Sequence, residues 1–195
     1  MRPLPFVYPY VIVFWTLYVG VFVPEFLLIR KAGRRRPARQ DRGSVFVIML
    51  GNGVGATIAF VCAFEARGAA IVTGRVVVFW IGLALIAAGA LVRQHCFRVL
   101  GASFKPVVDV EPSQAIVERG AYRVLRHPSY AGATLLFLGL GFALTNWASV
   151  LVILVMLAVV YGYRMHVEEA ALVATLGDPY RQYMARTKRI VPFVW

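Results

Sequence analysis

Charged side chains are scarce in this chain of 195 residues, which has only nine acidic residues and 15% charged residues overall. Soluble domains carry about 25% charged residues, so the composition excludes an ordinary soluble protein. Hydrophobic residues make up 60% of the chain, and the mean hydropathy is +0.71. The composition therefore predicts an integral membrane protein.

Residues that form cross-links or bind metals are also few, with two cysteines and three histidines. Cys62 is expected near the outer end of one apolar segment and Cys96 near the inner end of the next, whereas a disulfide needs Cα atoms within about 7 Å. The spacing of His95, His127 and His166 matches no metal-ligand motif. The sequence therefore predicts neither a disulfide nor a metal site.

Long apolar runs occupy most of the chain, and they lack the two-residue alternation that a membrane β-barrel requires. About 20 helical residues cross the hydrocarbon core of a bilayer, which is about 30 Å thick. Five runs fit this length or approach it: Tyr8 to Ile29, Val45 to Glu65, Val76 to Phe97, Tyr130 to Thr145 and Trp147 to Tyr163. We expect an all-α membrane fold of five transmembrane helices. Because only Asn146 separates the last two, they should form a tight hairpin.

The basic residues are distributed unevenly, because 18 of the 21 fall within residues 30–42, 93–126 and 164–189. The other three are Arg2, Arg67 and Arg75. By the positive-inside rule, the N-terminus lies outside and the C-terminus lies in the cytosol. This topology accounts for the net charge of +12, so no nucleic-acid partner is predicted. The bias towards arginine over lysine, with abundant alanine, valine and glycine, indicates a GC-rich bacterial genome and hence an inner-membrane location.

Small and acidic residues inside the runs have simple interpretations. The glycines of residues 51–56 resemble a dinucleotide fingerprint, but no strand precedes them, so close helix packing is the better interpretation. Gly82 and Gly89 are interpreted in the same way. Glu25 is expected to reach the membrane surface or to pair with Arg30, and a buried functional carboxylate is the less favoured alternative.

Two clusters of ionisable residues, at 122–132 and 164–169, flank the predicted hairpin. Since a hairpin returns the chain to the side that it left, both clusters should meet at one face of the bilayer. Pro128 suits the first turn of a helix, with His127 before it. The free N–H groups at such a helix start donate hydrogen bonds and so readily bind a carboxylate or a phosphate.

Tyr161, Arg164 and Glu168 follow one another at helical spacing and therefore share one face. An arginine at the membrane boundary can hold an anionic headgroup, and the carboxylate can hold a cationic or hydroxyl-bearing ligand. The alternative is a simple surface ion pair, worth about 0.3 to 0.5 kcal/mol. The connection over residues 100–125 is too mixed for another span, and we expect it to fold over the site as a cap.

Several motifs in the second half of the chain support a resemblance to a known family. They are Gly120-Ala-Tyr-Arg-Val-Leu-Arg-His-Pro-Ser-Tyr-Ala-Gly132, Glu168-Glu169-x-x-Leu172, Leu176-Gly-Asp-Pro-Tyr180-x-x-Tyr183 and Thr187-Lys-Arg-Ile-Val-Pro192-Phe. This half resembles the isoprenylcysteine carboxyl methyltransferase family, which belongs to a broader set that includes phospholipid N-methyltransferases. The resemblance divides the chain into a three-helix membrane region, 1–99, and a cofactor-binding catalytic region, 100–195.

The resemblance implies S-adenosylmethionine as the cofactor. Carried over position by position, its contacts would come from Gln114, Ala115, Ile116, Val117, Tyr122, His127, Pro128, Ser129, Tyr130 and Glu168. Eukaryotic members usually carry a histidine where Gln114 stands here. Arg164 matches the family arginine that is assigned to the substrate carboxylate, so it is the predicted catalytic and substrate-binding residue.

The expected activity is carboxyl O-methylation of an isoprenylcysteine-like or other lipid acid at the cytosolic face. The acceptor is a lipophilic small molecule or a prenylated group, and no obligate protein partner is predicted. A phospholipid or small-lipid N-methyltransferase is an alternative, for which His127, His166 and Glu169 are candidate proton acceptors. The sequence is also compatible with an NADPH-dependent reductase of the sterol-reductase type and with a non-enzymatic membrane scaffold.

Overall fold

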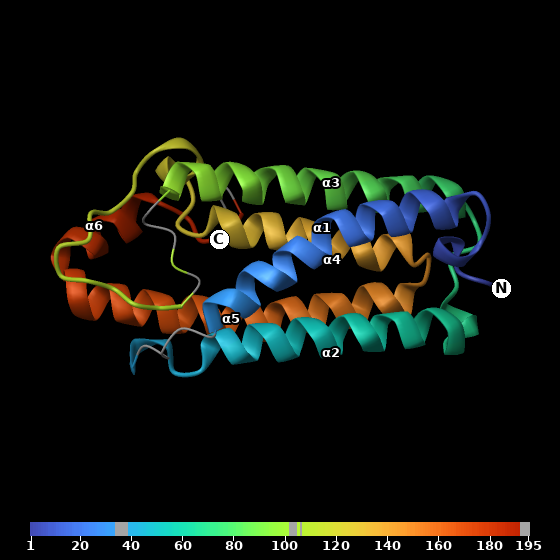
Figure 1. Ribbon diagram of the computed structural model, residues 1–195, viewed down its shortest axis with the longest axis horizontal. Coiled ribbons are helices and arrows are strands. Elements are labelled where there is room, and N and C mark those ends of the chain that lie inside the picture. The colour runs from blue at the N-terminus through green and yellow to red at the C-terminus, as the bar shows by residue number, and fades with distance from the viewer. Residues whose placement is uncertain (34–38, 102–104, 106, 192–195) are drawn as a thin grey trace.

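The computed structural model describes residues 1–33, 39–101, 105 and 107–191, and within these ranges the regular elements are all helices (Figure 1). The three arginines at 34–36, within the basic segment 30–42, lie outside the described residues. The α-helices are α1 (Tyr10–Gly33), α2 (Ser44–Glu65), α3 (Arg75–Leu100), α4 (Pro128–Ala143), α5 (Trp147–Leu176) and α6 (Asp178–Arg186). Short 3-10 helices are η1 (Leu4–Phe6), η2 (Arg39–Asp41), η3 (Arg67–Ala69) and η5 (Gly120–Arg123).

The predicted all-α membrane fold is confirmed. Four of the described helices, α1, α2, α3 and α5, are long and apolar enough to cross a membrane, and α4 is a shorter apolar helix. Five expected spans therefore correspond to four full-length helices and a short one. The last predicted run ends at Tyr163, but α5 continues to Leu176 over 30 residues. At 1.5 Å per residue this helix is about 45 Å long, so its final turns extend beyond a 30 Å hydrocarbon core.

The α4–α5 hairpin forms as predicted, and Asn146 explains how it turns. The Asn146 side chain accepts hydrogen bonds from the backbone N–H groups of Ala148 and Ser149, which caps the start of α5. Its amide nitrogen donates to the carbonyl of Ala66 at 2.9 Å. The turn is therefore tied to the loop that follows α2.

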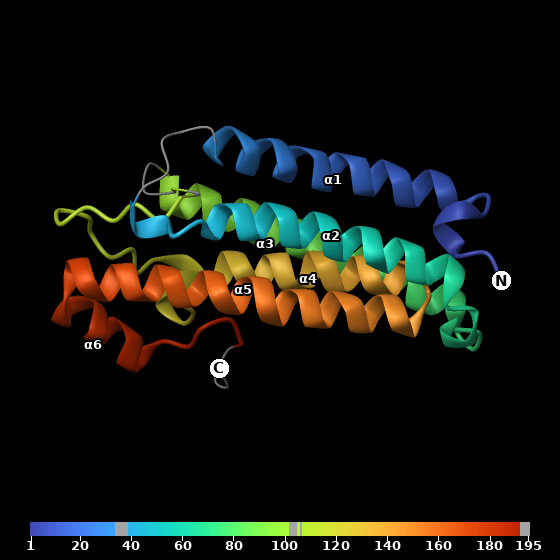
Figure 2. The same cartoon turned by 90° about the horizontal axis from the view of Figure 1, so that it is seen from below.

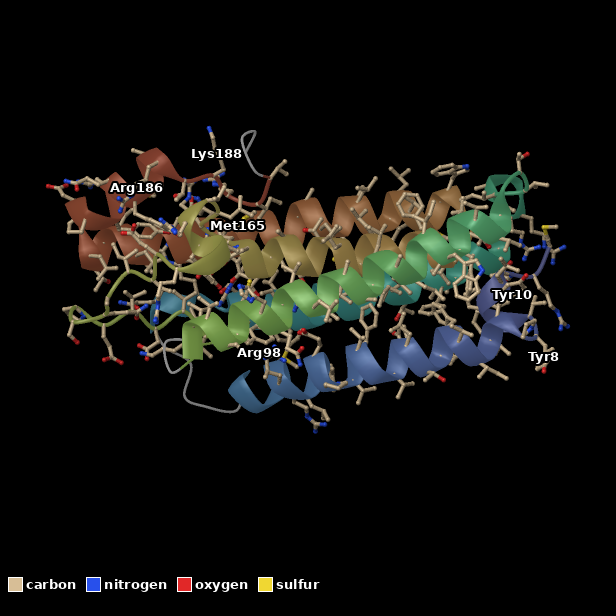
Figure 3. The ribbon with its side chains drawn as sticks, turned by 90° about the horizontal axis from the view of Figure 1, so that it is seen from above. Tyr8, Tyr10, Arg98, Met165, Arg186 and Lys188 are labelled. Atoms are coloured by element: carbon tan, nitrogen blue, oxygen red, sulfur yellow. The ribbon has the colours of Figure 1, made fainter. Side chains whose placement is uncertain are left out.

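The hairpin brings both ionisable clusters to one end of the bundle, here called the polar end and formed by residues 39–45, 107–130 and 164–191. Figures 1 and 2 show α6 and the C-terminal part of α5 at this end, with the N-terminus at the other. In Figure 3, Arg186 and Lys188 lie towards the polar end, and Tyr8 and Tyr10 lie at the opposite end.

Glycines set the separation of the helices that carry the site. A Cβ atom on Gly82 or Gly89 would meet the backbone of α4, and one on Gly51 or Gly55 would meet side chains of α5. Small residues at these positions let helices approach closely, which is how membrane helices gain packing energy. The structure thus confirms the packing interpretation at Gly51, Gly55, Gly82 and Gly89. It is wrong at Gly53, where a Cβ atom would meet nothing within 4 Å.

Candidate functional site

A cavity of about 160 Å³ lies at the polar end, between the cap, the start of α4 and the C-terminal part of α5. We call it the polar cavity. Its lining combines apolar and ionisable side chains, namely Leu100, Lys105, Val107–Val110, Gln114–Val117, Tyr122, Arg126, His127, Ser129, Tyr130, Arg164, Glu168, Leu172, Leu176, Tyr180 and Tyr183. Residues from 100 to 183 therefore meet around one space.

Ten of the eleven site residues predicted from the sequence line the polar cavity. The exception is Pro128, the first residue of α4, which is fully buried and does not face the cavity. His127 is the residue that caps α4, as the sequence indicates. The structure thus brings together two clusters that lie about 40 residues apart along the chain.

Tyr130 joins these two clusters. Its hydroxyl donates to Glu168 Oε2 at 2.5 Å and accepts a hydrogen bond from Arg164 Nε at 2.9 Å. The direct distance from Arg164 Nε to Glu168 Oε2 is 3.8 Å. The ion pair between Arg164 and Glu168 is therefore present, but the Tyr130 hydroxyl makes shorter contacts to both residues.

Arg164 has a second carboxylate partner, Asp41, which lies closer to it than Glu168 does. Asp41 belongs to η2, in the segment before α2, and that segment carries no recognised motif. One terminal nitrogen of the guanidinium, Nη1, lies 2.7 Å from Asp41 Oδ1 and also donates to Ser44 Oγ. Asp41 in turn accepts from the backbone N–H groups of Val45 at 3.1 Å and Val108 at 3.0 Å. This single carboxylate connects α2, the cap and α5.

The surroundings of Asp41 keep it ionised. Burial by itself would raise the pKa of this carboxyl group, but the two backbone N–H donors and the positive charge of Arg164 outweigh it and hold the pKa below its ordinary value. Sequence reasoning did not select Asp41. The available signal was an isolated acid within the basic segment 30–42.

Glu169 joins several side chains at the polar end. Its carboxylate receives Arg126 Nε at 3.0 Å and Arg189 Nη2 at 2.8 Å, and it lies 3.2 Å from His127 Nε2. Residues 124–127 also exchange backbone hydrogen bonds with residues 188–189. The predicted motif at 187–193 therefore docks against the start of α4, although its Pro192 and Phe193 lie outside the described residues.

The predicted cap lies along α5. Val108 and Val110 are buried against Val167 and Ala171 on the extended part of that helix. Gln40 accepts from the backbone N–H of Val110 at 2.7 Å. The segment before α2 therefore holds the cap over the polar cavity.

A second cavity of about 390 Å³ lies deeper in the bundle, and we call it the membrane cavity. Its walls are mainly apolar and aromatic and include Tyr18, Phe22, Val23, Glu25, Phe26, Met49, Asn52, Ala56, Phe60, Arg93, Ala133, Leu136, Phe137 and Tyr161. The two cavities share no lining residue but are adjacent, because the rings of Tyr130 and Tyr161 lie 5.5 Å apart.

The predicted pairing of Glu25 with Arg30 is wrong. Both carboxylate oxygens of Glu25 lie 2.6 Å from the guanidinium of Arg93 on α3, and Arg30 is exposed. Residues five apart on a helix point about 140° away from one another, so Arg30 faces away from this pair. Arg93 also donates to Ser129 Oγ at 3.2 Å, which places the ion pair between the two cavities.

The polar cavity offers both apolar cover and a hydrogen-bond acceptor to a water-soluble ligand. Apolar and aromatic side chains can cover a base, and Glu168 can accept from hydroxyl or amino groups. Burial raises the pKa of Tyr183 to about 12, so its hydroxyl is neutral and donates to the carbonyl of Tyr122. No group of three or more histidine, cysteine or acidic side chains able to hold a metal ion occurs in the described ranges.

The fold and the site define a multi-pass helical membrane protein with a polar cavity at one end and an apolar cavity beside it. A family model described as phospholipid methyltransferase matches residues 77–178, which is more than half of the chain. The chain belongs to this family.

Relatives with assigned names carry a narrower description. The chain is 31% identical over 121 residues to protein-S-isoprenylcysteine O-methyltransferase B of Arabidopsis thaliana, which covers 60% of this chain and 61% of the relative. It is also 31% identical over 114 residues to protein-S-isoprenylcysteine O-methyltransferase of Schizosaccharomyces pombe. This match covers 57% of this chain and 48% of the relative. The chain thus spans less than two thirds of these relatives.

A solved structure supports the fold. The eukaryotic intramembrane Ras methyltransferase ICMT (isoprenylcysteine carboxyl methyltransferase) superposes with a TM-score of 0.62 over 73% of this chain and 52% of the other. The two sequences are 22% identical over this match. The similarity therefore shows a shared membrane fold.

Proposed function

We propose that this protein is an S-adenosylmethionine-dependent methyltransferase that methylates a carboxylate on a lipophilic acceptor. The observation that carries the proposal is the placement of Arg164 and Glu168 in the polar cavity, directly beside an apolar cavity of about 390 Å³. The polar cavity suits a water-soluble donor, and the membrane cavity suits a lipid tail. Family membership supports methyl transfer to a lipid acceptor. The names of the relatives, which are isoprenylcysteine O-methyltransferases, support transfer to an oxygen.

S-adenosylmethionine, when bound, supplies an electrophilic methyl group. Glu168 would accept hydrogen bonds from the amino or hydroxyl groups of this cofactor, and the cap would cover its base. The polar cavity encloses about 160 Å³, whereas ligand cavities usually enclose about 300 Å³ or more. A bound cofactor would therefore extend beyond the enclosed volume.

Arg164 would bind the acceptor carboxylate and aim one of its oxygens at the methyl carbon. The cofactor would supply the methyl group and keep the bonding electrons on its sulfur, while Arg164 would hold the oxygen that receives it. Because a carboxylate is already ionised at neutral pH, no general base is needed. Catalysis then depends on orientation and on the exclusion of water.

The contacts of the candidate proton acceptors favour a carboxylate over an amine acceptor. An aliphatic amine is protonated at neutral pH and must lose that proton before its nitrogen can attack, so a nearby base would help. Glu169 is engaged by Arg126 and Arg189 and lies beside His127, while His166 is exposed and outside the polar cavity. No such base is required if the acceptor is a carboxylate.

Binding and product analysis with the detergent-solubilised protein test the proposal. We expect saturable binding of S-adenosylhomocysteine by calorimetry and transfer of labelled methyl from S-adenosylmethionine to N-acetyl-S-farnesylcysteine. A methyl ester releases methanol in base, whereas an N-methyl product does not. Binding of NADPH instead would indicate a reductase, and binding of neither cofactor would indicate a scaffold.

A further inference from the structure

Two tyrosines of α6, Tyr180 and Tyr183, line the polar cavity. Each is 3% exposed, and their rings lie 5.8 Å apart. The Tyr183 hydroxyl donates to the carbonyl of Tyr122 at 2.8 Å and lies 3.3 Å from that of Leu125. The Tyr180 hydroxyl, by contrast, has no hydrogen bond to any described residue. The protein itself therefore satisfies one of these two buried hydroxyls and not the other.

The Tyr180 hydroxyl opens onto the polar cavity. Among the described residues, Asn52 Oδ1 is the fully enclosed side-chain atom that lacks a hydrogen-bond partner. The Tyr180 hydroxyl lacks a partner too but is not fully enclosed, so the small surface that this side chain keeps includes its oxygen. Buried polar side chains of folded proteins nearly always have a partner. A buried hydroxyl that faces a cavity therefore indicates a ligand that bonds to it.

The charges around this hydroxyl indicate which ligand group suits it. Burial, followed by the charges of Glu168 and Glu169, raises the pKa of Tyr180, so the hydroxyl is neutral and can donate. Arg126 acts in the opposite direction, but it is bonded to Glu169 and to two backbone carbonyls. A ligand carboxylate beside Tyr180 would be repelled by both acidic side chains, whereas a neutral oxygen would not. The hydroxyl therefore suits a neutral acceptor oxygen.

We propose that Tyr180 donates to one ribose hydroxyl of S-adenosylmethionine, while Glu168 accepts from the neighbouring hydroxyl. A pair of adjacent hydroxyls suits these two side chains, because one can accept while the other donates. This inference rests on the proposed function, since it takes S-adenosylmethionine as the ligand of the polar cavity. It adds Tyr180 to the cofactor contacts expected from the sequence and assigns the ribose to the part of the cavity between α5 and α6.

Three ligands that differ only in the ribose test this contact: S-adenosylhomocysteine and its 2′-deoxy and 3′-deoxy analogues. Their affinities are measured by calorimetry on the full detergent-solubilised chain and on Tyr180→Phe, which removes only the hydroxyl oxygen. We expect Tyr180→Phe to weaken binding of S-adenosylhomocysteine about fivefold. One deoxy analogue should bind both proteins equally, because it lacks the hydroxyl that Tyr180 contacts. That analogue identifies the ribose hydroxyl.

A matched variant and a fourth ligand assign the effect. Tyr163→Phe is the control, because the Tyr163 hydroxyl donates to the carbonyl of Arg42 at 3.1 Å on the exposed surface, outside the polar cavity. It should keep all three affinities. The fourth ligand, 5′-deoxy-5′-methylthioadenosine, has the ribose but no amino acid, and Tyr180→Phe should weaken its binding about fivefold as well. An unchanged affinity for this ligand would place Tyr180 at the amino acid and overturn the ribose contact.

The outcomes separate this inference from the proposed function. Equal affinity of the native protein and Tyr180→Phe for S-adenosylhomocysteine overturns the role of Tyr180, and so does a loss that persists with both deoxy analogues. If Tyr180→Phe does not fold, equal binding of the three ligands to the native protein has the same consequence. If no nucleoside binds, the proposed cofactor and this contact fail together. If the ligands bind as expected but no lipid acid is methylated, carboxyl methylation fails while the role of Tyr180 stands.

Discussion

Two arginines are buried in the described part of the chain, Arg93 and Arg164, and each is paired with a carboxylate from the N-terminal half. Asp41, the partner of Arg164, also accepts from Ser44 Oγ and from two backbone N–H groups, and it connects three segments. Glu25, the partner of Arg93, makes a two-point contact with that residue alone among the described hydrogen bonds. The Glu25 side chain is 20% exposed.

The comparison shows that similar ion pairs can serve different purposes. The Asp41–Arg164 pair lies at the polar cavity and fixes both the cap and the predicted catalytic guanidinium. The Glu25–Arg93 pair attaches α1 to α3 beside the membrane cavity, and α1 lies on the outside of the bundle in Figure 2. We therefore expect disruption of the first pair to affect both chemistry and stability, and disruption of the second to affect mainly stability.

The largest effect is expected from Arg93→Met. This change leaves the partly buried Glu25 without its counter-charge, which costs up to about 3 kcal/mol because some of the carboxylate stays exposed. Thermal unfolding in detergent should show a large loss of stability. The double variant Glu25→Gln/Arg93→Met removes both charges and should recover most of it. An unaffected single variant would show that Glu25 is solvated and that the pair is not structural.

Arg164→Ala tests the catalytic side of the comparison. We expect turnover of a carboxylate acceptor to fall at least about 100-fold, as when a fixed donor to a reacting oxygen is removed. Affinity for S-adenosylhomocysteine should fall much less than turnover, since Arg164 acts on the cofactor site through Asp41 and Tyr130. Arg164→Lys keeps the charge but loses the planar geometry, so it should recover only part of the activity. Full activity in the alanine variant would exclude a carboxylate at this position.

Asp41→Asn should reduce stability at neutral pH by about 2 kcal/mol, because the carboxylate bonds are charge-assisted. The pKa of Asp41 is lowered in the folded state, so its contribution is fully present above the ordinary carboxyl pKa of about 3.9. This contribution is lost as the pH falls through the lower, folded-state value. Unfolding curves of the two proteins should therefore converge below about pH 4, and a constant difference there would contradict this account.

The smallest effect is expected from Glu168→Ala, which should weaken binding of S-adenosylhomocysteine about tenfold by removing a charged acceptor. Calorimetry measures this change. Glu118→Ala provides the control, because Glu118 pairs with Arg186 at 2.6 Å on the exposed surface, outside the polar cavity. Unchanged affinity in Glu168→Ala would remove the proposed role of this residue.

The sequence predicted the positions of the membrane helices because each depends on a local property, a long apolar run. It also predicted the hairpin, since only Asn146 separates two such runs. Most of the polar cavity was identified by the resemblance of the motifs at 114–130 and 164–168 to a known family. Helical spacing by itself indicated only that Tyr161, Arg164 and Glu168 share one face. The end of α5 was placed too early, at Tyr163, because hydropathy marks where apolar residues stop and not where the helix ends.

The amino-acid sequence by itself determined a helical membrane protein, the pairing of α4 with α5 and the end of the bundle at which the ionisable groups gather. Tertiary structure alone decided which acids pair with the buried arginines, since Glu25 and Arg93 are 68 residues apart and Asp41 and Arg164 are 123 apart. It also decided that Tyr180 lines the polar cavity. Such contacts depend on how helices pack, and no local pattern in the chain specifies them.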